Sequence, residues 1–445
     1  MLRFSFACLF LFTSIATACG AGTDIPAAIE GVKSSDPAAA AQSVATLRAA
    51  GPAGLAALLK HYDAAPDPNL IGAIDAVAAQ RGAVVSRLFW FTDLAGARAA
   101  AKAANKPILY LRMMGKLTDE YSCANSRFFR TVLYANTEVS KVLREQFVLV
   151  WISERPVPVV TIDYGDGRVL KRTLTGNSIH YILDSDGRVI DALPGLYAPK
   201  TFLSALSSAR TVALAANGNQ EQLSRYLANA ETTLLRDWQS DLALAAVGPM
   251  SLNNPKGQVG QLEQPTTVVF NPAANPAAAP AAPPAAAAMR RAFSKTAVEA
   301  PIIARLSPQV DPQPLLNPAS SIEMADATTW EKVAALHLAD ARLDASSIAM
   351  IRTQNPKAYQ DPAALNKIVE RFQTLIAADT VHNNYQLRRQ IISWLRQSPG
   401  KLSVEQLNER VYSELFLTPR TDPWLGLAPD EYTALNGNGC EVAKR

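Results

Sequence analysis

The sequence predicts an α/β protein, with a mixed sheet covered by helices, a helical segment before it and an all-α unit after it. Three observations carry this prediction. Two continuous apolar runs, at 108–111 and 147–152, are typical of strands buried on both faces. Helical segments alternate with these runs, and two turn-marked hairpins follow them. Ala and Leu at helical spacing are frequent in region 24–86, and apolar residues such as Trp330, Val333 and Leu336 repeat at helical intervals in region 321–445.

The first 18 residues have the features of a secretory signal peptide. A charged start, Met1-Leu2-Arg3, precedes a short apolar run, and Ala16-Thr17-Ala18 suits a cleavage site. Cys19 follows directly, so lipidation is an alternative to plain export, and an uncleaved anchor is a third. The chain is therefore expected to be exported to the periplasm or secreted, or to be held on a membrane as a lipoprotein through Cys19. No later stretch is long and apolar enough to span a membrane.

Composition narrows the class of protein further. The formal net charge is only +4 over 445 residues and the basic residues are spread out, so no nucleic-acid partner is expected. Removal of the signal peptide leaves Cys19, Cys123 and Cys440, which are too few for a disulfide scaffold, so stability must come from burial. A single bridge between Cys123 and Cys440 stays open as a structural alternative.

Residues 24–86 form the first predicted helical region. Breaks at Gly51-Pro52 and Pro66-Asp67-Pro68 divide it into short amphipathic helices. These helices are either one or two HEAT-type units or a helical cap on the next domain.

The predicted α/β domain covers residues 87–212. Its first helix is capped at Thr92-Asp93 and ends before Lys106-Pro107, where the first buried strand begins. Its second helix opens at Cys123. A helix capped by Asn136 or Thr137 and the strand 147–152 follow. Two hairpins come next: 159–170 turns at Gly165-Asp166-Gly167, and 179–190 turns at Asp184-Ser185-Asp186-Gly187. A closing helix begins at Pro199. This order implies a mixed sheet covered by helices.

The remainder of the chain is predicted to be helical on both sides of a linker. Residues 213–248 extend the domain with a buried stripe formed by Leu223, Tyr226, Leu227, Leu234 and Leu235. Residues 249–320 are rich in Ala and Pro, cannot build a core and are expected to act as a spacer. Residues 321–445 form a helical unit with an irregular tail, for which a protein partner is expected.

Several landmarks of the α/β domain together resemble a known superfamily. They are Trp90, Asn105-Lys106-Pro107 before the strand, Cys123 at a helix start, the strand 147–150, and the hairpin 181–190. Over residues 87–212 this order is similar to that of the thioredoxin-like superfamily, especially its secreted members. The resemblance implies a thioredoxin-like sheet domain. No cofactor and no metal are expected.

The resemblance also implies a site. Cys123 stands in a Cys-x-x-Ser arrangement, with Ser126 in the place of the second cysteine, so the pair Cys123 and Ser126 would act as a monothiol center. The candidate activity is thiol–disulfide exchange or capture of thiols and disulfides on exported proteins. Ser178 occupies the place of the family's cis-proline, and Cys440 is a candidate resolving or disulfide partner. Arg127, Ser178 and His180 would support the reaction.

Chemistry at Cys123 depends on where its sulfur lies. A helix N-terminus favours the thiolate, and the Ser126 hydroxyl could donate to it. The hypothesis requires a sulfur that solvent and other proteins can reach. The alternatives are an inert buried thiol or a structural disulfide, in which case the fold would be a redox-inactive scaffold for binding or assembly.

Neighbouring side chains allow two interpretations each. In the first interpretation His180 is a base, or a copper ligand together with Cys123 and Met113 or Met114. In the second, which is preferred, His180 is a hydrogen-bonded histidine within a sheet. Arg127 and Arg130 could stabilise the thiolate, or they could belong to a solvated helix face.

Overall fold

The computed structural model describes residues 24–174, 176–216, 219–247, 322, 325–423 and 425. The chain divides into two compact units, Met1–Val77 and Ala78–Arg445. The expected boundary between residues 86 and 87 therefore falls inside the second unit. The predicted signal peptide, Cys19, the linker 249–320 and Cys440 lie outside the described residues.

The first unit is helical, as predicted. Its helices are α1 (Ile25–Gly31), α2 (Pro37–Ala49), α3 (Pro52–Ala64), the 3-10 turn η1 (Pro68–Leu70) and α4 (Ile71–Ala78). Proline stands at the start of α1, α2, α3 and η1, where no backbone N–H is needed. Side chains of Asp24, Asp36 and Asp67 cap three of these starts. The leucines of α3 supply the core of this unit.

The second unit is built on a five-stranded mixed sheet, in agreement with the predicted class. Its strands are β1 (Trp90–Phe91), β2 (Ile108–Met113), β3 (Val148–Ser153), β6 (Ser178–Leu183) and β7 (Val189–Pro194). They lie in the order β1-β3-β2-β6-β7. β3 is parallel to β1 and β2, whereas β6 is antiparallel to β2 and β7. Every residue of β2, β6 and β7 is buried, so both faces of the sheet are covered.

The helices that connect and close the sheet are α5 (Ala83–Ser86), α6 (Leu94–Ala104), α7 (Ala124–Phe128), the π-helical turn η2 (Phe129–Leu133), α8 (Thr137–Gln146), α9 (Pro199–Ala216) and α10 (Gln220–Val247). Of these, α6, α7, α8 and α9 begin at or next to the residues that the sequence predicts. Asp93 and Asn136 accept hydrogen bonds as N-caps of α6 and α8. Along α10, Leu223, Leu227 and Leu234 are buried, but Leu235 is 39% exposed, so the expected buried stripe is narrower than predicted.

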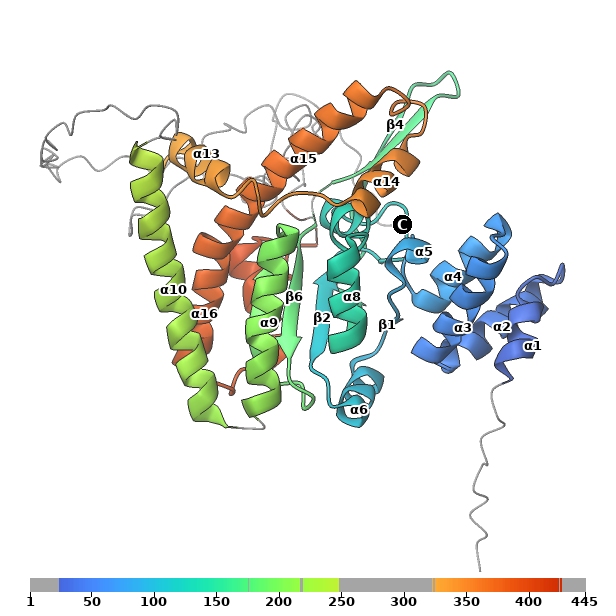
Figure 1. Cartoon of the computed structure of the whole chain (residues 1–445), viewed down its shortest axis with the longest axis horizontal. Coiled ribbons are helices and arrows are strands. Elements are labelled where there is room, and N and C mark those ends of the chain that lie inside the picture. Colours follow the sequence, from blue (N-terminus) through green and yellow to red (C-terminus); the bar gives the residue numbers. More distant parts are fainter. Residues whose placement is uncertain are drawn as a thin grey trace, which may run out of the picture. The chain divides into compact units, whose positions relative to one another are not determined.

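The C-terminal region is also helical. Its elements are α13 (Ala327–Leu336), α14 (Ala345–Gln354), α15 (Pro362–His382), η3 (Asn383–Arg388), α16 (Arg389–Gln397), α17 (Val404–Arg410) and η4 (Val411–Leu415). In Figure 1 α10 runs beside α16, and α13 and α15 lie across the same end of the sheet unit. These helices share one hydrophobic core with the sheet. The described C-terminal helices and the sheet therefore belong to one compact unit.

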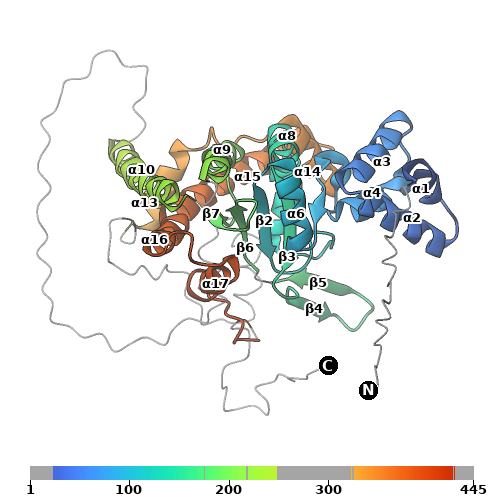
Figure 2. The ribbon, with the colours of Figure 1, turned by 90° about the horizontal axis from the view of Figure 1, so that it is seen from below.

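The two faces of the sheet are covered by different parts of the chain (Figure 2). On one face, His180 of β6 packs against Phe129 of η2 and Phe202 of α9. On the other face, the hydroxyl of the neighbouring Tyr181 donates to Asn408 Oδ1 of α17 at 3.1 Å. The C-terminal helices thus cover a face that the elements of 87–212 leave open.

The predicted inserted hairpin forms a separate two-stranded sheet. Its strands are β4 (Val159–Asp163) and β5 (Val169–Thr173), which pair antiparallel. The hairpin exposes Val159, Ile162, Tyr164 and Val169 at 48%, 41%, 54% and 50%. The hairpin therefore carries exposed apolar side chains on both of its strands.

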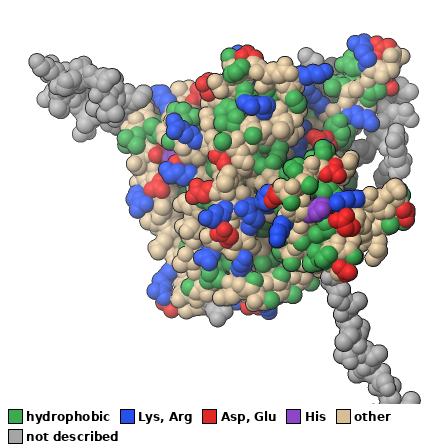
Figure 3. All heavy atoms as spheres, turned by 45° about the vertical axis from the view of Figure 1, so that its right-hand side comes forward, with side chains coloured by type: hydrophobic (Ala, Val, Ile, Leu, Met, Phe, Trp, Pro, Cys, Tyr) green, Lys and Arg blue, Asp and Glu red, His purple; other side chains and the backbone are tan. Residues whose placement is uncertain are grey.

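Charge is distributed evenly over the surface that Figure 3 draws, where Lys and Arg side chains are interspersed with Asp and Glu. This distribution agrees with the small net charge of +4. Among the helices in the described part of the chain, none has the length and apolar character needed to cross a membrane.

Candidate functional site

Cys123 lies at the end of a loop that follows β2, as the N-cap residue of α7. α7 runs directly into η2, so the helical segment that begins at Cys123 continues to Leu133. The sulfur lies 3.2 Å from the hydroxyl oxygen of Ser178, the first residue of β6. The fold therefore brings together Cys123 and Ser178, which are 55 residues apart in the sequence.

The cysteine is fully buried, which corrects the expectation of an accessible sulfur. Cys123, Ser126 and Ser178 each have an exposed fraction of 0%. The backbone at Gly176 lies so close that a Cβ atom there would be 2.7 Å from the Cβ of Cys123. The hydroxyl of Tyr412, in η4, donates to the carbonyl of Asn177 at 3.0 Å. The C-terminal region thus holds the segment that covers the sulfur.

The structure gives Ser126 a different contact from the expected one. Its hydroxyl oxygen lies within hydrogen-bond distance of the Cys123 carbonyl, at 2.9 Å, and of the Ser122 hydroxyl, at 2.5 Å. Both contacts lie within the start of the helical segment, which is a common local pattern for a serine in a helix. The contact to the Cys123 sulfur comes from Ser178 instead, so Ser126 has a local structural role.

The two arginines of this helical segment point to other partners. Arg127 donates from Nη2 to Thr173 Oγ1 of β5 at 3.0 Å. Arg130 donates to Ser122 Oγ at 3.2 Å and to the Leu117 carbonyl at 3.5 Å. Arg130 is only 8% exposed, so it does not belong to a solvated helix face. Burial lowers the pKa of its guanidinium to about 10.

His180 is a buried histidine within the sheet. Its Nε2 lies 2.6 Å from the Tyr134 hydroxyl, and its ring packs between Phe129 and Phe202. Burial lowers its pKa to about 3, so the ring is neutral. In the described part of the chain no group of three or more His, Cys, Asp or Glu side chains could hold a metal ion. The hydrogen bond and ring contacts of His180 agree with the preferred interpretation of a hydrogen-bonded histidine within a sheet.

The close approach of the Gly176 backbone to Cys123 can be tested by substitution. Gly176→Ala is expected to lower the free energy of unfolding by about 2–4 kcal/mol, because φ is +101° and the new Cβ would meet Cys123. Gly165→Ala is the matched control, since Gly165 has φ +75° but open space around it. Urea unfolding of both variants checks this; equal losses would show that Gly176 is not packed against the cysteine.

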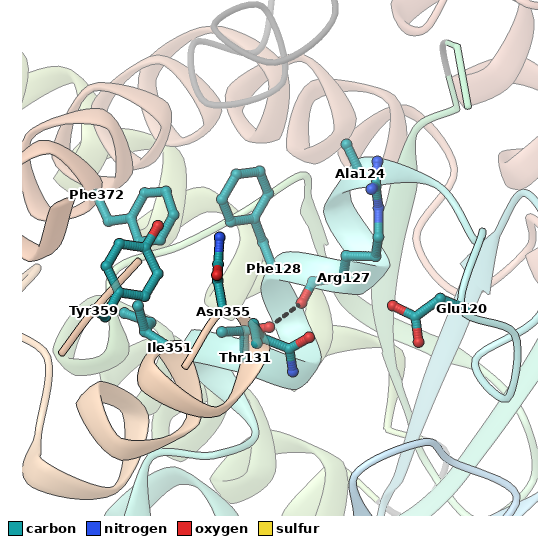
Figure 4. A pocket seen from close by; sticks show the side chains of 10 residues that line it. Glu120, Ala124, Arg127, Phe128, Thr131, Ile351, Asn355, Tyr359 and Phe372 are labelled. Atoms are coloured by element: carbon teal, nitrogen blue, oxygen red, sulfur yellow. Dashed lines mark hydrogen bonds between the residues drawn. The ribbon is translucent and has the colours of Figure 1, made fainter. Parts of the chain in front are cut away.

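A pocket lies one turn along α7 from Cys123. Its volume is about 250 Å³, and it is lined by Glu120, Ala124, Arg127, Phe128, Thr131, Ile351, Gln354, Asn355, Tyr359 and Phe372. Figure 4 shows aromatic side chains on one side of it and Arg127 with Glu120 on the other. The walls come from the α7 segment and from α14, α15 and the loop that joins them. Sequence reasoning missed this pocket, because nothing in the sequence indicates that residues 351–372 face residues 120–131.

Comparisons with protein-family models, with curated proteins and with solved structures found no match to this chain. The geometry of the site therefore carries the functional argument.

Proposed function

We propose that this protein is a redox-inactive binding or assembly module that uses a thioredoxin-like fold as a scaffold. The strand order β1-β3-β2-β6-β7 supports this proposal, because parallel strands alternate with helices and an antiparallel hairpin precedes the closing helix α9. That is the arrangement that the sequence resemblance over 87–212 implies. The exposed apolar hairpin β4–β5 supports a role in contacting a protein partner.

The burial of the Cys123 sulfur is the observation that carries the proposal. Thiol–disulfide exchange requires direct contact between the attacking and the attacked sulfur atoms. Cys123 is 0% exposed, and no second cysteine lies in the described part of the chain. The hydrogen bond from Tyr412 to Asn177 ties the segment beside the sulfur to the C-terminal helices, so uncovering the sulfur by moving that segment would break this bond.

Monothiol exchange through Cys123 is the second candidate function. The position of Cys123 at a helix N-terminus favours this candidate, as does the Ser178 hydroxyl at 3.2 Å, because both can stabilise a thiolate. A mixed disulfide with an exported protein would form only after the C-terminal cover opened. The reaction would then consume a client disulfide, release one client thiol, and need an external thiol to free Cys123.

Alkylation of Cys123 distinguishes the two candidates. In a chain with Cys8, Cys19 and Cys440 replaced by serine, iodoacetamide is expected to label native Cys123 at least about 100-fold more slowly than denatured Cys123, because labelling requires local opening. Mass spectrometry at several pH values gives the rate. Rapid labelling with an apparent pKa well below about 8.5 would instead support the monothiol function.

A further inference from the structure

Arg130 is a buried cation whose observed contacts are to neutral oxygens. Its hydrogen bonds go to the Ser122 hydroxyl and the Leu117 carbonyl, and its Nε has no hydrogen-bond partner among the described residues. Burying a charge is costly unless the charge is paired. An arginine in this state is therefore complementary to an anion that is not part of the described chain.

A small cavity lies against this arginine. Its volume is about 60 Å³, and it is lined by Arg81, Gly82, Glu120, Arg127, Arg130, Thr131, Met350 and Gln354. The single carboxylate among them, that of Glu120, pairs with Arg81 at 2.5 Å. Arg127 and Arg130 leave a net positive charge at the cavity wall, since their hydrogen bonds go to hydroxyl and carbonyl oxygens.

The cavity adjoins the larger apolar pocket. Glu120, Arg127, Thr131 and Gln354 line both spaces. In the larger pocket, the rings of Phe128 and Phe372 meet edge to face with centroids 5.6 Å apart, and Tyr359 lies beside them. The combined space therefore has a cationic end and an aromatic end.

We propose that these adjoining spaces bind a small organic carboxylate, with its charged group on Arg127 and Arg130 and its aromatic or branched apolar body among Phe128, Tyr359 and Phe372. The volume fits this class of ligand, because a cavity of about 150 Å³ holds benzene, and the larger pocket here is about 250 Å³. Arginine suits a carboxylate because its planar donors can bind both oxygens. This inference rests on the proposed binding function and names the class of ligand.

Binding of 3-phenylpropionate to the full chain tests the inference, with 3-phenylpropionamide as the neutral probe of the same shape. We expect saturable binding of the acid by ligand-observed NMR, and binding of the amide at least about tenfold weaker, since hydrogen bonds to a charged group are the stronger ones. Arg130→Gln is expected to remove this preference for the acid. Arg352→Gln, an exposed arginine on α14 that lines neither space, is the matched control and should bind as the unchanged chain does.

Several results would overturn the inference. These are no saturable binding of the acid at millimolar concentration, equal binding of acid and amide, or an unchanged preference in Arg130→Gln. If Arg130→Gln does not fold, two variants at half-buried positions, Arg127→Gln and Phe372→Ala, serve as the test instead. Each should weaken binding of the acid at least about tenfold. Rapid alkylation of Cys123 would contradict the proposed scaffold function, whereas an inert Cys123 together with failed ligand binding would contradict only this inference.

Discussion

Asp191→Ala is expected to lower the free energy of unfolding by about 3–5 kcal/mol, because it leaves the buried guanidinium of Arg388 without its counterion. Asp191 lies on β7 and is 0% exposed, and Arg388 lies on η3 and is 8% exposed. Their side chains form two parallel bonds, Nη2 to Oδ2 at 2.5 Å and Nε to Oδ1 at 3.2 Å. Chemical unfolding followed by circular dichroism measures the loss.

The surroundings of Asp191 explain why so large a loss is expected. The carboxylate also accepts the Tyr226 hydroxyl at 2.5 Å and the Ala192 backbone N–H at 2.7 Å. Although burial alone would lower the pKa of Arg388, the charge of Asp191 holds that pKa above its ordinary value. In the variant that charge is gone, so burial acts on the guanidinium unopposed by Asp191, and Arg388 stays buried without an acid.

A double variant provides the control. Asp191→Leu with Arg388→Met removes both charges and should recover a large part of the stability lost in Asp191→Ala, since apolar residues of similar volume can replace a buried ion pair. A loss in Asp191→Ala below about 1 kcal/mol would contradict the prediction, because that size is typical of an exposed ion pair.

Much of the sheet and its connecting helices could be predicted because their signals are local. The apolar runs of β2 and β3 are recognisable from a few consecutive residues, and so are the helix N-caps Asp93 and Asn136. The hairpin β4–β5 was predicted from its glycine turn and the alternation around it. β1 was missed because two residues, Trp90 and Phe91, are too few to show a period.

The candidate site could be predicted only in part, since its decisive contacts are long-range. The position of Cys123 at a helix start is a local property and was predicted. The segment beside its sulfur is held by Tyr412, which donates to the Asn177 carbonyl across 235 residues of sequence. Likewise, the partner of Asp191 lies 197 residues away. Single-sequence patterns carry no information on which distant faces meet, so the cover over the cysteine and the pocket beside it were both missed.

Buried acids link the C-terminal helices to the sheet at two separate places. Asp191 lies at the edge strand β7, where Arg388 meets it from η3. Glu154 directly follows β3, which is separated from β7 by β2 and β6. Its Oε1 accepts a hydrogen bond from the Asn408 side chain of α17 at 2.9 Å. Because both links join the sheet to segments far along the chain, we expect the sheet and the C-terminal helices to unfold together.

The second of these acids gives a stability that depends on pH. Burial alone would raise the pKa of Glu154, but hydrogen bonds and charges from Arg112 and Arg420 lower it below its ordinary value of 4.5. A carboxyl group whose pKa is lower in the folded state stabilises that state above its unfolded pKa. This stabilisation is lost as the pH falls through the folded-state pKa, so it should be complete at neutral pH and disappear in acid.

Glu154→Gln is therefore expected to lower the free energy of unfolding at pH 7 by about 3–5 kcal/mol, because Arg112, which is also buried, loses its counterion. The difference between the variant and the unchanged chain should shrink as the pH falls below about 4, where Glu154 itself becomes protonated. Urea unfolding at a series of pH values measures both effects. Glu145→Gln, at an exposed site on α8, is the control and should change stability by less than about 0.5 kcal/mol at every pH. A constant difference for Glu154→Gln from neutral pH into acid would mean that the variant loses packing rather than a charge.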